Sequence, residues 1–241
     1  MKKILLLILF CTAALYGAPM GKKDKISKSW TITNNYWSCS FIEGAMFPGS
    51  FTFADSSSAG GILFRDTAVS NGKEFYLFEE RRAAENIVVN TEKEFIIELT
   101  GTYWRNLTPL ITPVSGVKVI CRYEFQKNSP SVKMIFKYEV SDNANVRFNS
   151  FFNIGWYYEN PFEKVIADGK TFDMKKGLSF SDKKNIIFEN SKFIAEFISD
   201  NAFMHVPLRK SIIACSFGSA ENMKKRSGFF EKHAVLKLQK R

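Results

Sequence analysis

Hydrophobic and polar residues alternate strictly in two neighbouring segments. In Val117–Gln126 the apolar side chains fall on every second position, and in Val132–Val140 they do so again. This period of two is typical of a strand with one buried face. The residues between the segments, Lys127–Pro130, include Asn and Pro, which favour a turn. The pattern therefore predicts an antiparallel hairpin.

Shorter strand-like runs fill most of the remaining chain, and turn-forming pairs such as Asn71-Gly72 and Asp168-Gly169 separate them. Helical patterns are scarce, and no repeat of fixed period stands out. The sequence therefore predicts an all-β fold, a large antiparallel two-sheet β-sandwich. Its further predicted strands are Trp30–Thr33, Tyr36–Ile42, Ser50–Phe53, Gly61–Arg65, Glu74–Glu79, Ile87–Asn90, Glu94–Tyr103, Arg147–Tyr157, Lys164–Ala167, Ile186–Glu189, Phe193–Ile198, Ala202–Val206, Ser211–Phe217 and Phe229–Leu238.

The first residues have the three parts of a secretory signal peptide. Lys2 and Lys3 precede a short apolar run, and small residues follow at Gly17 and Ala18. We expect residues 1–18 to be the signal peptide, residues 19–28 a flexible polar lead-in, and residues 29–241 a single domain. A lipid anchor on Cys11 is disfavoured because no small residue precedes it. The expected location is the periplasm or the exterior of a bacterium, with no membrane span in the mature chain.

Composition and charge limit the classes of partner that the protein is expected to bind. The chain has 241 residues, of which 45% are hydrophobic and 15% aromatic, and its formal net charge is +10. Basic charge favours nucleic acid, an anionic membrane or an acidic polymer, or belongs to a solvated surface. Nucleic acid is not expected for an exported chain. A polysaccharide, anionic in character, is therefore the partner that charge and export favour together.

The cysteines do not form a pattern typical of a metal site. Beyond Cys11, the cysteines are Cys39, Cys121 and Cys215, and each lies in an apolar, strand-like run. Three cysteines cannot all pair within one chain. We expect buried free thiols, with one disulfide, Cys121–Cys215, as the alternative. No spacing typical of zinc occurs, and no cofactor motif is present.

Candidate catalytic residues are few. The chain has two histidines, His205 and His233, and no Gly-x-Ser-x-Gly motif. His205 lies in a predicted strand, and the simplest interpretation is that a histidine there has a structural role. Imidazole is, however, the usual general acid or base near neutral pH, so His205 is also the candidate catalytic residue. Its candidate carboxylate partners are Glu79 and Glu159. We expect His233 to lie at the surface.

Aromatic side chains next to arginine and asparagine are the strongest functional signal. Trp104 and Arg105 follow one predicted strand, and the stretch 151–160 is rich in aromatic residues, with Trp156 and Tyr158 on one face by alternation. Core packing explains most rings. Flat rings beside hydrogen-bonding groups also bind sugars, and with Arg82 these residues form the predicted ligand-binding surface.

Three stretches resemble the galactose-mutarotase-like β-supersandwich, which is found in carbohydrate epimerases, glycoside hydrolases and polysaccharide lyases. Ile32–Phe41 is similar to its opening strand pair, Gly60–Ile62 to its early glycine turn, and Cys121–Tyr138 to its central strand, Ser-Pro turn and strand. The resemblance implies a supersandwich in a carbohydrate context. The epimerases of that family use a His and Glu pair, and neither histidine of this chain lies in such a setting.

Three functions are compatible with these patterns. The first is an exported carbohydrate-binding or carbohydrate-processing accessory protein that recognises a glycan by its aromatic and arginine surface. The second is a sugar-acting enzyme of epimerase, lyase or hydrolase type that uses His205 and a carboxylate. The third is a non-enzymatic envelope or scaffold protein whose rings all lie in the core. Fold alone does not decide among them.

Overall fold

The structure is a computed structural model, and it describes residues 18–60, 62–64, 66–77, 82–107, 110–148, 154–157, 162–173, 178–203, 206–209, 212–215 and 227–241. Every regular element in these ranges is a β-strand. Since the described ranges hold strands alone, none of their elements is a helix with the length and apolarity of a membrane span.

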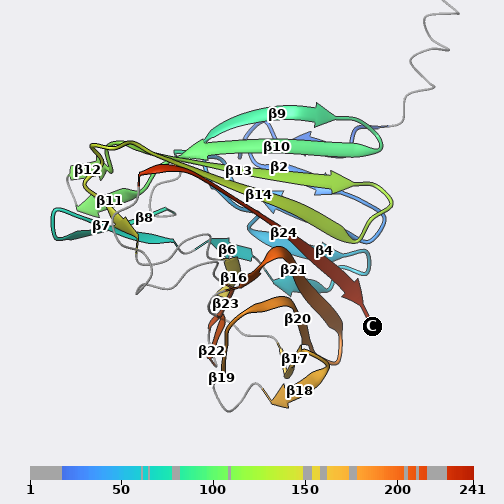
Figure 1. Ribbon diagram of the computed structural model, residues 1–241. Helices are drawn as coiled ribbons and strands as arrows, with labels where there is room; N and C mark the ends of the chain where they lie inside the picture. The colour runs from blue at the N-terminus through green and yellow to red at the C-terminus, as the bar shows by residue number, and fades with distance from the viewer. Residues whose placement is uncertain are drawn as a thin grey trace, which may run out of the picture.

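Nine antiparallel strands form the large sheet, which crosses the whole molecule in Figure 1. Its long central strands run side by side, and the sheet bends away at the edge formed by β17 and β18. In order across the sheet the strands are β18 (Lys170–Asp173), β17 (Lys164–Ala167), β20 (Lys183–Glu189), β21 (Phe193–Phe203), β24 (Gly228–Lys240), β14 (Ser131–Val140), β13 (Val117–Gln126), β10 (Glu94–Gly101) and β9 (Ala84–Asn90).

The predicted central hairpin is confirmed as β13 and β14. Val117 pairs with Val140 and Phe125 with Val132, without a register shift between them. Along β13 buried and more exposed residues alternate at every position. The large sheet therefore has an inner, buried face and an outer face that carries charged side chains, as a period of two requires.

The N-terminal sheet covers part of the inner face. Trp37 and Phe41 of this sheet make edge contacts with Phe125 of β13, with ring centroids 6.0 Å apart in both cases. Such edge-on pairs add to the free energy gained by burying the rings. The strands, in sheet order, are β1 (Gly21–Lys23), β2 (Trp30–Thr33), β3 (Trp37–Phe41), β4 (Ser50–Phe53) and β5 (Ser58–Gly60).

The expected polar lead-in contains a strand. Gly21–Lys23 pairs with β2, and the preceding Met20 is buried. The side chain of Asn90 bonds both the N–H and the carbonyl of Gly21, and a Cβ on Gly21 would lie 2.2 Å from the ring of Phe95. The order of this segment thus depends on Asn90, which lies 69 residues further along the chain. The local polarity of the segment does not reveal this contact.

Two further antiparallel ladders complete the part of the chain that the structure describes. Arg147–Tyr157, predicted as one strand, contributes β15 to one ladder and β16 to the other. Phe148 of β15 packs against Tyr138 of β14, so the first ladder also contacts the inner face. The β8 ladder has the order β12 (Leu110–Pro113), β11 (Trp104–Leu107), β8 (Lys73–Tyr76), β7 (Thr67–Ser70) and β15 (Arg147–Phe148); the β16 ladder has the order β19 (Leu178–Phe180), β22 (Val206–Arg209), β23 (Ile212–Cys215), β16 (Ile154–Tyr157) and β6 (Ile62–Phe64).

These layers confirm the predicted antiparallel β-sandwich. The layer that faces the large sheet is divided into shorter ladders. Phe125, Phe136 and Tyr123 of β13 and β14 lie fully buried between the layers. Most of the ring content of the described residues therefore fills the core, as the simplest interpretation of the composition predicted.

The cysteines of the described core are free thiols. Cys39 and Cys121 are both buried and unpaired. The alternative disulfide Cys121–Cys215 is therefore wrong. Cys121 lies on the inner face of β13, where alternation directs it into the apolar layer.

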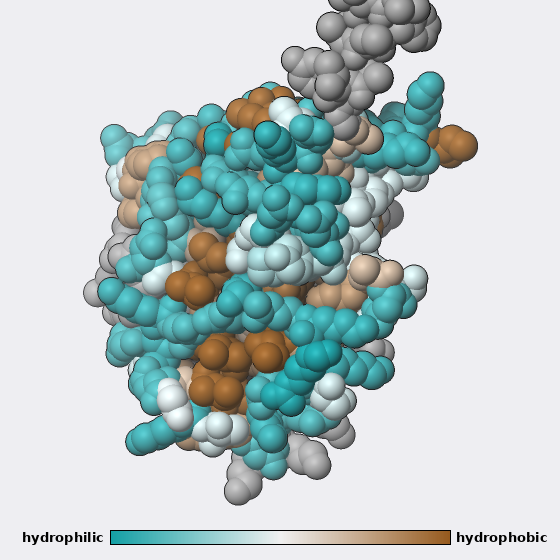
Figure 2. All heavy atoms as spheres, turned by 90° about the vertical axis from the view of Figure 1, so that its right-hand side faces the viewer, coloured by the Kyte–Doolittle hydropathy of each residue, from teal (hydrophilic) through white to brown (hydrophobic). Residues whose placement is uncertain are grey.

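Hydrophobic side chains also reach the surface. Figure 2 shows them gathered in patches, separated by hydrophilic groups, on the side of the molecule that faces right in Figure 1. Ile198 of β21 and Val88 of β9 are among the exposed large side chains. Single exposed apolar residues are normal on a soluble protein, so they do not by themselves indicate a site.

Candidate functional site

The structure describes only part of the predicted site. Tyr158, His205, Glu79 and Glu159 lie outside the described residues. Of Trp156 the backbone alone is described, paired in β16 with Ile62 and Ile213. The side chains of Arg82, Trp104 and Arg105 are described, so the geometry of the predicted surface is built from these three residues.

Arg82 and Trp104 lie together. The guanidinium carbon of Arg82 is 5.2 Å from the centroid of the Trp104 ring, which is a cation–π contact. Arg82 is exposed and Trp104 is half-buried. The two residues come from different segments, one just before β9 and the other at the start of β11, so the fold makes a pair that sequence spacing does not contain.

Arg105 lies on the other side of β11. Neighbouring residues on a strand point to opposite faces, so Arg105 and Trp104 do not share one surface. The Nη1 atom of Arg105 is buried and has no hydrogen-bond partner among the described residues. The contact surface built from described residues therefore consists of Arg82 and Trp104, with Arg105 behind them.

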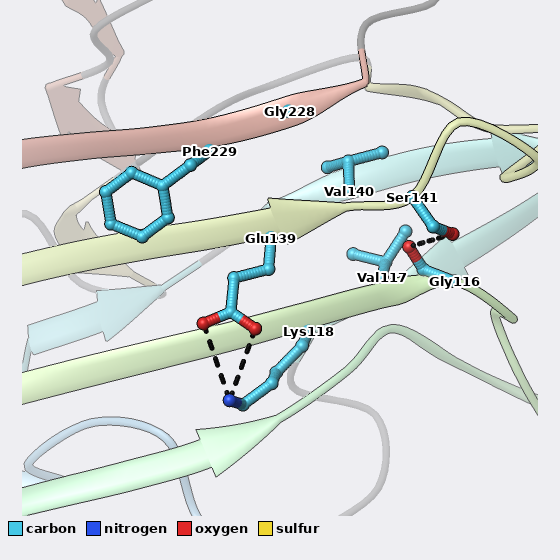
Figure 3. A pocket seen from close by; sticks show the side chains of 8 residues that line it. All are labelled: Gly116, Val117, Lys118, Glu139, Val140, Ser141, Gly228 and Phe229. Atoms are coloured by element: carbon cyan, nitrogen blue, oxygen red, sulfur yellow. Dashed lines mark hydrogen bonds and ion pairs between the residues drawn. The ribbon is translucent and has the colours of Figure 1, made fainter.

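A pocket of about 480 Å³ opens at one end of the outer face of the large sheet. Figure 3 shows Phe229, Glu139 and Lys118 side by side on β24, β14 and β13. The Nζ atom of Lys118 lies 3.2 Å from one carboxylate oxygen of Glu139. Phe229 is 57% exposed, so a large apolar side chain lies beside this charged pair. The lining residues are Gly116, Val117, Lys118, Glu139, Val140, Ser141, Gly228 and Phe229.

Local sequence explains how the pocket is built. Phe229 and Phe230 are neighbours on β24, so only one of the two rings can face the core. Phe230 packs against the core and pairs with Tyr138, which leaves Phe229 outside. Gly228 has a φ of 121°, a conformation that favours glycine, and no atom lies within 4 Å of the place where a Cβ would be. The strand therefore begins with a bare backbone beside the ring.

The register of the large sheet relates the pocket to the Arg82–Trp104 pair. Ala84 pairs with Thr100, Thr100 with Ile120, Ile120 with Lys137, and Lys137 with Glu231, so these residues form one row across the outer face. Two residues further toward the same end, the next row holds Lys118, Glu139 and Phe229. Arg82 stands two residues before Ala84, the first residue of β9, so it lies near the same end of the sheet as the pocket.

His233 lies on the same outer face and has carboxylate partners. Its Nε2 atom is 2.6 Å from Glu231, and its Nδ1 atom is 3.4 Å from Asp200. The contact with His233 and a second contact with Lys137 lower the pKa of Glu231. His233 is half-buried rather than fully exposed, and its ring nitrogens lie between the two carboxylates. Among the described residues no group of three or more His, Cys, Asp and Glu side chains could hold a metal ion.

Sequence periodicity alone does not predict the pocket, although one signal is present. The predicted strand Phe229–Leu238 begins with two consecutive phenylalanines. Alternation requires one of them to point outward. Lys118 and Glu139 gave no comparable signal, because charged residues on an outer strand face are the normal case.

Solved structures share the fold of this chain, but those described below differ from it widely in sequence. No family model and no curated protein matches the sequence. An α-mannosidase from Enterococcus faecalis V583 superposes with a TM-score of 0.65 at 9% identity, over 93% of this chain and 30% of that one. A GH36 α-galactosidase from Geobacillus stearothermophilus gives 0.61 at 8% identity, over 92% of this chain and 41% of that one. The chain thus spans less than half the length of these enzymes.

The galactose 1-epimerase of Lactobacillus acidophilus NCFM is similar over its whole length. Its TM-score is 0.52 at 8% identity, and the match covers 92% of this chain and 98% of that chain. At such identities the likeness establishes the fold alone. The protein has the galactose-mutarotase-like fold, a class of β-sandwich that recurs in carbohydrate-active proteins, and the resemblance in the sequence is confirmed at that level.

Proposed function

We propose that this chain is an exported carbohydrate-binding protein that recognises a glycan through a surface centred on Arg82 and Trp104. The observation that carries the proposal is the stacked pair itself, in which a guanidinium lies over an indole ring 5.2 Å away. An indole ring is a flat apolar surface of the kind on which the C–H groups of a sugar ring stack. The guanidinium offers several N–H donors to hydroxyl or carboxylate oxygens.

Charge favours an acidic glycan among the candidate ligands. The formal net charge of +10 raises the local concentration of anionic polymers and speeds encounter with them. Arginine binds carboxylate in a two-pronged geometry, and uronic acids carry a carboxylate on every ring. Trp156 and Tyr158 belong to the proposed surface as predictions from the sequence.

Affinity electrophoresis tests the proposal. The chain from residue 18 onward is run in gels that contain polygalacturonate, heparin or neutral dextran. We expect retardation by polygalacturonate that weakens with added salt, because exposed charges are screened. Trp104→Ala should lower the affinity about tenfold, which corresponds to about 1.4 kcal/mol, and Arg82→Ala should lower it and reduce its salt dependence.

Tyr36→Ala is the matched control, since Tyr36 is also an exposed aromatic residue but belongs to the turn between β2 and β3. It should bind like the wild type. Unretarded migration of the wild-type chain in every gel would contradict the proposal and favour the scaffold alternative.

A second candidate function is a sugar-acting enzyme. The observation that favours it is the match to nearly the whole of a galactose 1-epimerase, 98% of that chain. Polarimetry of freshly dissolved α-D-galactose tests it. An enzyme should speed the change in rotation, and His205→Ala or His233→Ala should remove the effect. A rate equal to that of buffer would exclude this activity.

A further inference from the structure

The pocket beside Phe229 has the composition of a sugar subsite. A flat ring 57% exposed forms one side, and the Lys118–Glu139 pair and the hydroxyl of Ser141 supply donors and acceptors. Its volume of about 480 Å³ lies within the usual range for small-ligand pockets, roughly 300–1,000 Å³. The pocket is shallow and widely open, so a ring of a longer chain can lie against it without its ends being enclosed.

The polar groups of the pocket are held in place. Lys118 and Glu139 are cross-strand neighbours in the register of β13 and β14, and both oxygens of Glu139 lie within 3.4 Å of the ammonium nitrogen. Ser141 Oγ donates to the carbonyl of Gly116 at 3.1 Å. Side chains fixed by such contacts lose little further freedom when a ligand binds, which favours affinity.

The position of Phe229 in the sheet distinguishes its ring from an ordinary exposed side chain. Phe229 pairs with Glu139, and Glu139 pairs with Lys118. Arg82 stands just before β9, the edge strand on the other side of the sheet. From β9 to β24 there are four steps between neighbouring strands, or about 19 Å. A single sugar ring that fills the pocket does not span this width, whereas a chain of several sugars can reach from β24 to β9.

We propose that the Phe229 pocket is a second subsite of the glycan-binding surface, and that the ligand is an acidic oligosaccharide that lies across the strands from β9 to β24. This inference rests on the proposed function. In it, one sugar stacks on Trp104 beside Arg82, and another stacks on Phe229 beside Lys118 and Glu139. The two rings belong to segments far apart in the chain, so only a ligand long enough to reach both gains from both.

A length series of oligogalacturonates from dimer to hexamer tests the inference by titration calorimetry. The wild-type chain should bind the hexamer much more tightly than the dimer. Phe229→Ala should lower hexamer affinity about tenfold and leave dimer affinity at the Arg82–Trp104 pair unchanged. Phe229→Trp, which keeps a flat ring, should retain the preference for the hexamer.

Ile198→Ala is the matched control, because it removes another exposed apolar side chain from the outer face of the same sheet. Its binding should equal that of the wild type, and the thermal midpoints of all variants should agree. If Phe229→Ala binds the hexamer like the wild type while Trp104→Ala does not, the second subsite is wrong and the proposed function stands. If the wild-type chain binds none of the oligomers, both are wrong.

Discussion

For single residues, burial decides the chemistry of the cysteines. Cys39 is 2% exposed and Cys121 is fully buried. Burial raises the pKa of both thiols well above the usual value, because an apolar surrounding disfavours the thiolate. Since the thiolate is the reactive form, both side chains behave as small hydrophobic groups and not as nucleophiles.

We therefore predict that neither thiol reacts in the folded protein. In a chain from residue 18 onward with Cys215→Ser, only Cys39 and Cys121 remain. Ellman's reagent should detect no thiol under native conditions and both thiols in denaturant. Rapid reaction of the native variant, or a missing thiol after denaturation, would contradict the buried and unpaired state.

Among elements, the turn before β3 joins the N-terminal sheet to the large sheet. Asn34 is 6% exposed, and its Oδ1 accepts hydrogen bonds from the N–H groups of Tyr36 and Trp37. Its Nδ2 donates to the carbonyl of Ser129 in the central hairpin turn, at 2.9 Å. One side chain therefore shapes its own turn and holds it against the neighbouring layer.

Asn34→Ala should destabilise the protein by about 2 kcal/mol, because it leaves buried backbone groups without partners. The midpoint of urea unfolding measures the effect. Asn128→Ala is the control: Asn128 lies in the same hairpin turn, but its contact with Asn35 is exposed. Its cost should be within about 0.5 kcal/mol. Equal losses in the two variants would show that the Asn34 contacts do not hold the layers together.

The outer face of β13 carries a charge cluster that responds to pH. Partial burial raises the pKa of Glu124, but hydrogen bonds from Arg122 at 2.7 Å and from Lys133 outweigh this effect, and the net pKa is lowered. A carboxyl group whose pKa is lower in the folded state stabilises the protein above its unfolded-state pKa, here about 4.5. That contribution declines as the pH falls through the folded-state value.

Glu124→Gln should accordingly cost about 1 kcal/mol near pH 7, and the difference from the wild type should shrink as the pH falls below about 4.5. Urea unfolding at a series of pH values measures it. Glu43→Gln is the control, because its pair with Lys28 is longer, at 3.6 Å, and more than half exposed. A difference that stays constant down to pH 3 would contradict the ionic origin.

At the scale of the whole molecule, the basic charge and the proposed export favour the same class of ligand. A basic surface outside the cytoplasm meets acidic polymers of envelopes and matrices rather than nucleic acid. Export itself rests on the pattern of the first residues, from Lys2 to Ala18.

Expression of the full chain in a bacterium tests that pattern. We expect the protein in the periplasmic fraction or the medium, with a mature N-terminus at Ala18 or Pro19 by mass spectrometry. Leu7→Arg, which places a charge in the apolar run, should keep the uncleaved chain in the cytoplasm. Cleavage before Cys11 with an added lipid mass would favour the lipoprotein alternative instead.

Local alternation in the sequence determined where the principal strands lie and which residues face the core. Val117–Gln126 and the strand after its turn show this best, since a period of two is a property of the extended backbone itself. The sequence likewise indicated the all-β class and its carbohydrate-associated fold. It did not reveal β1, whose order depends on Asn90 and Phe95.

Only the tertiary structure decided which side chains meet. Arg82 contacts Trp104, and one row of the large sheet brings Lys118, Glu139 and Phe229 together. These residues come from segments far apart in the chain. Packing and strand pairing bring the members of each group together, and pairing between distant strands leaves no periodic mark in the sequence, because it depends on the packing of both layers at once.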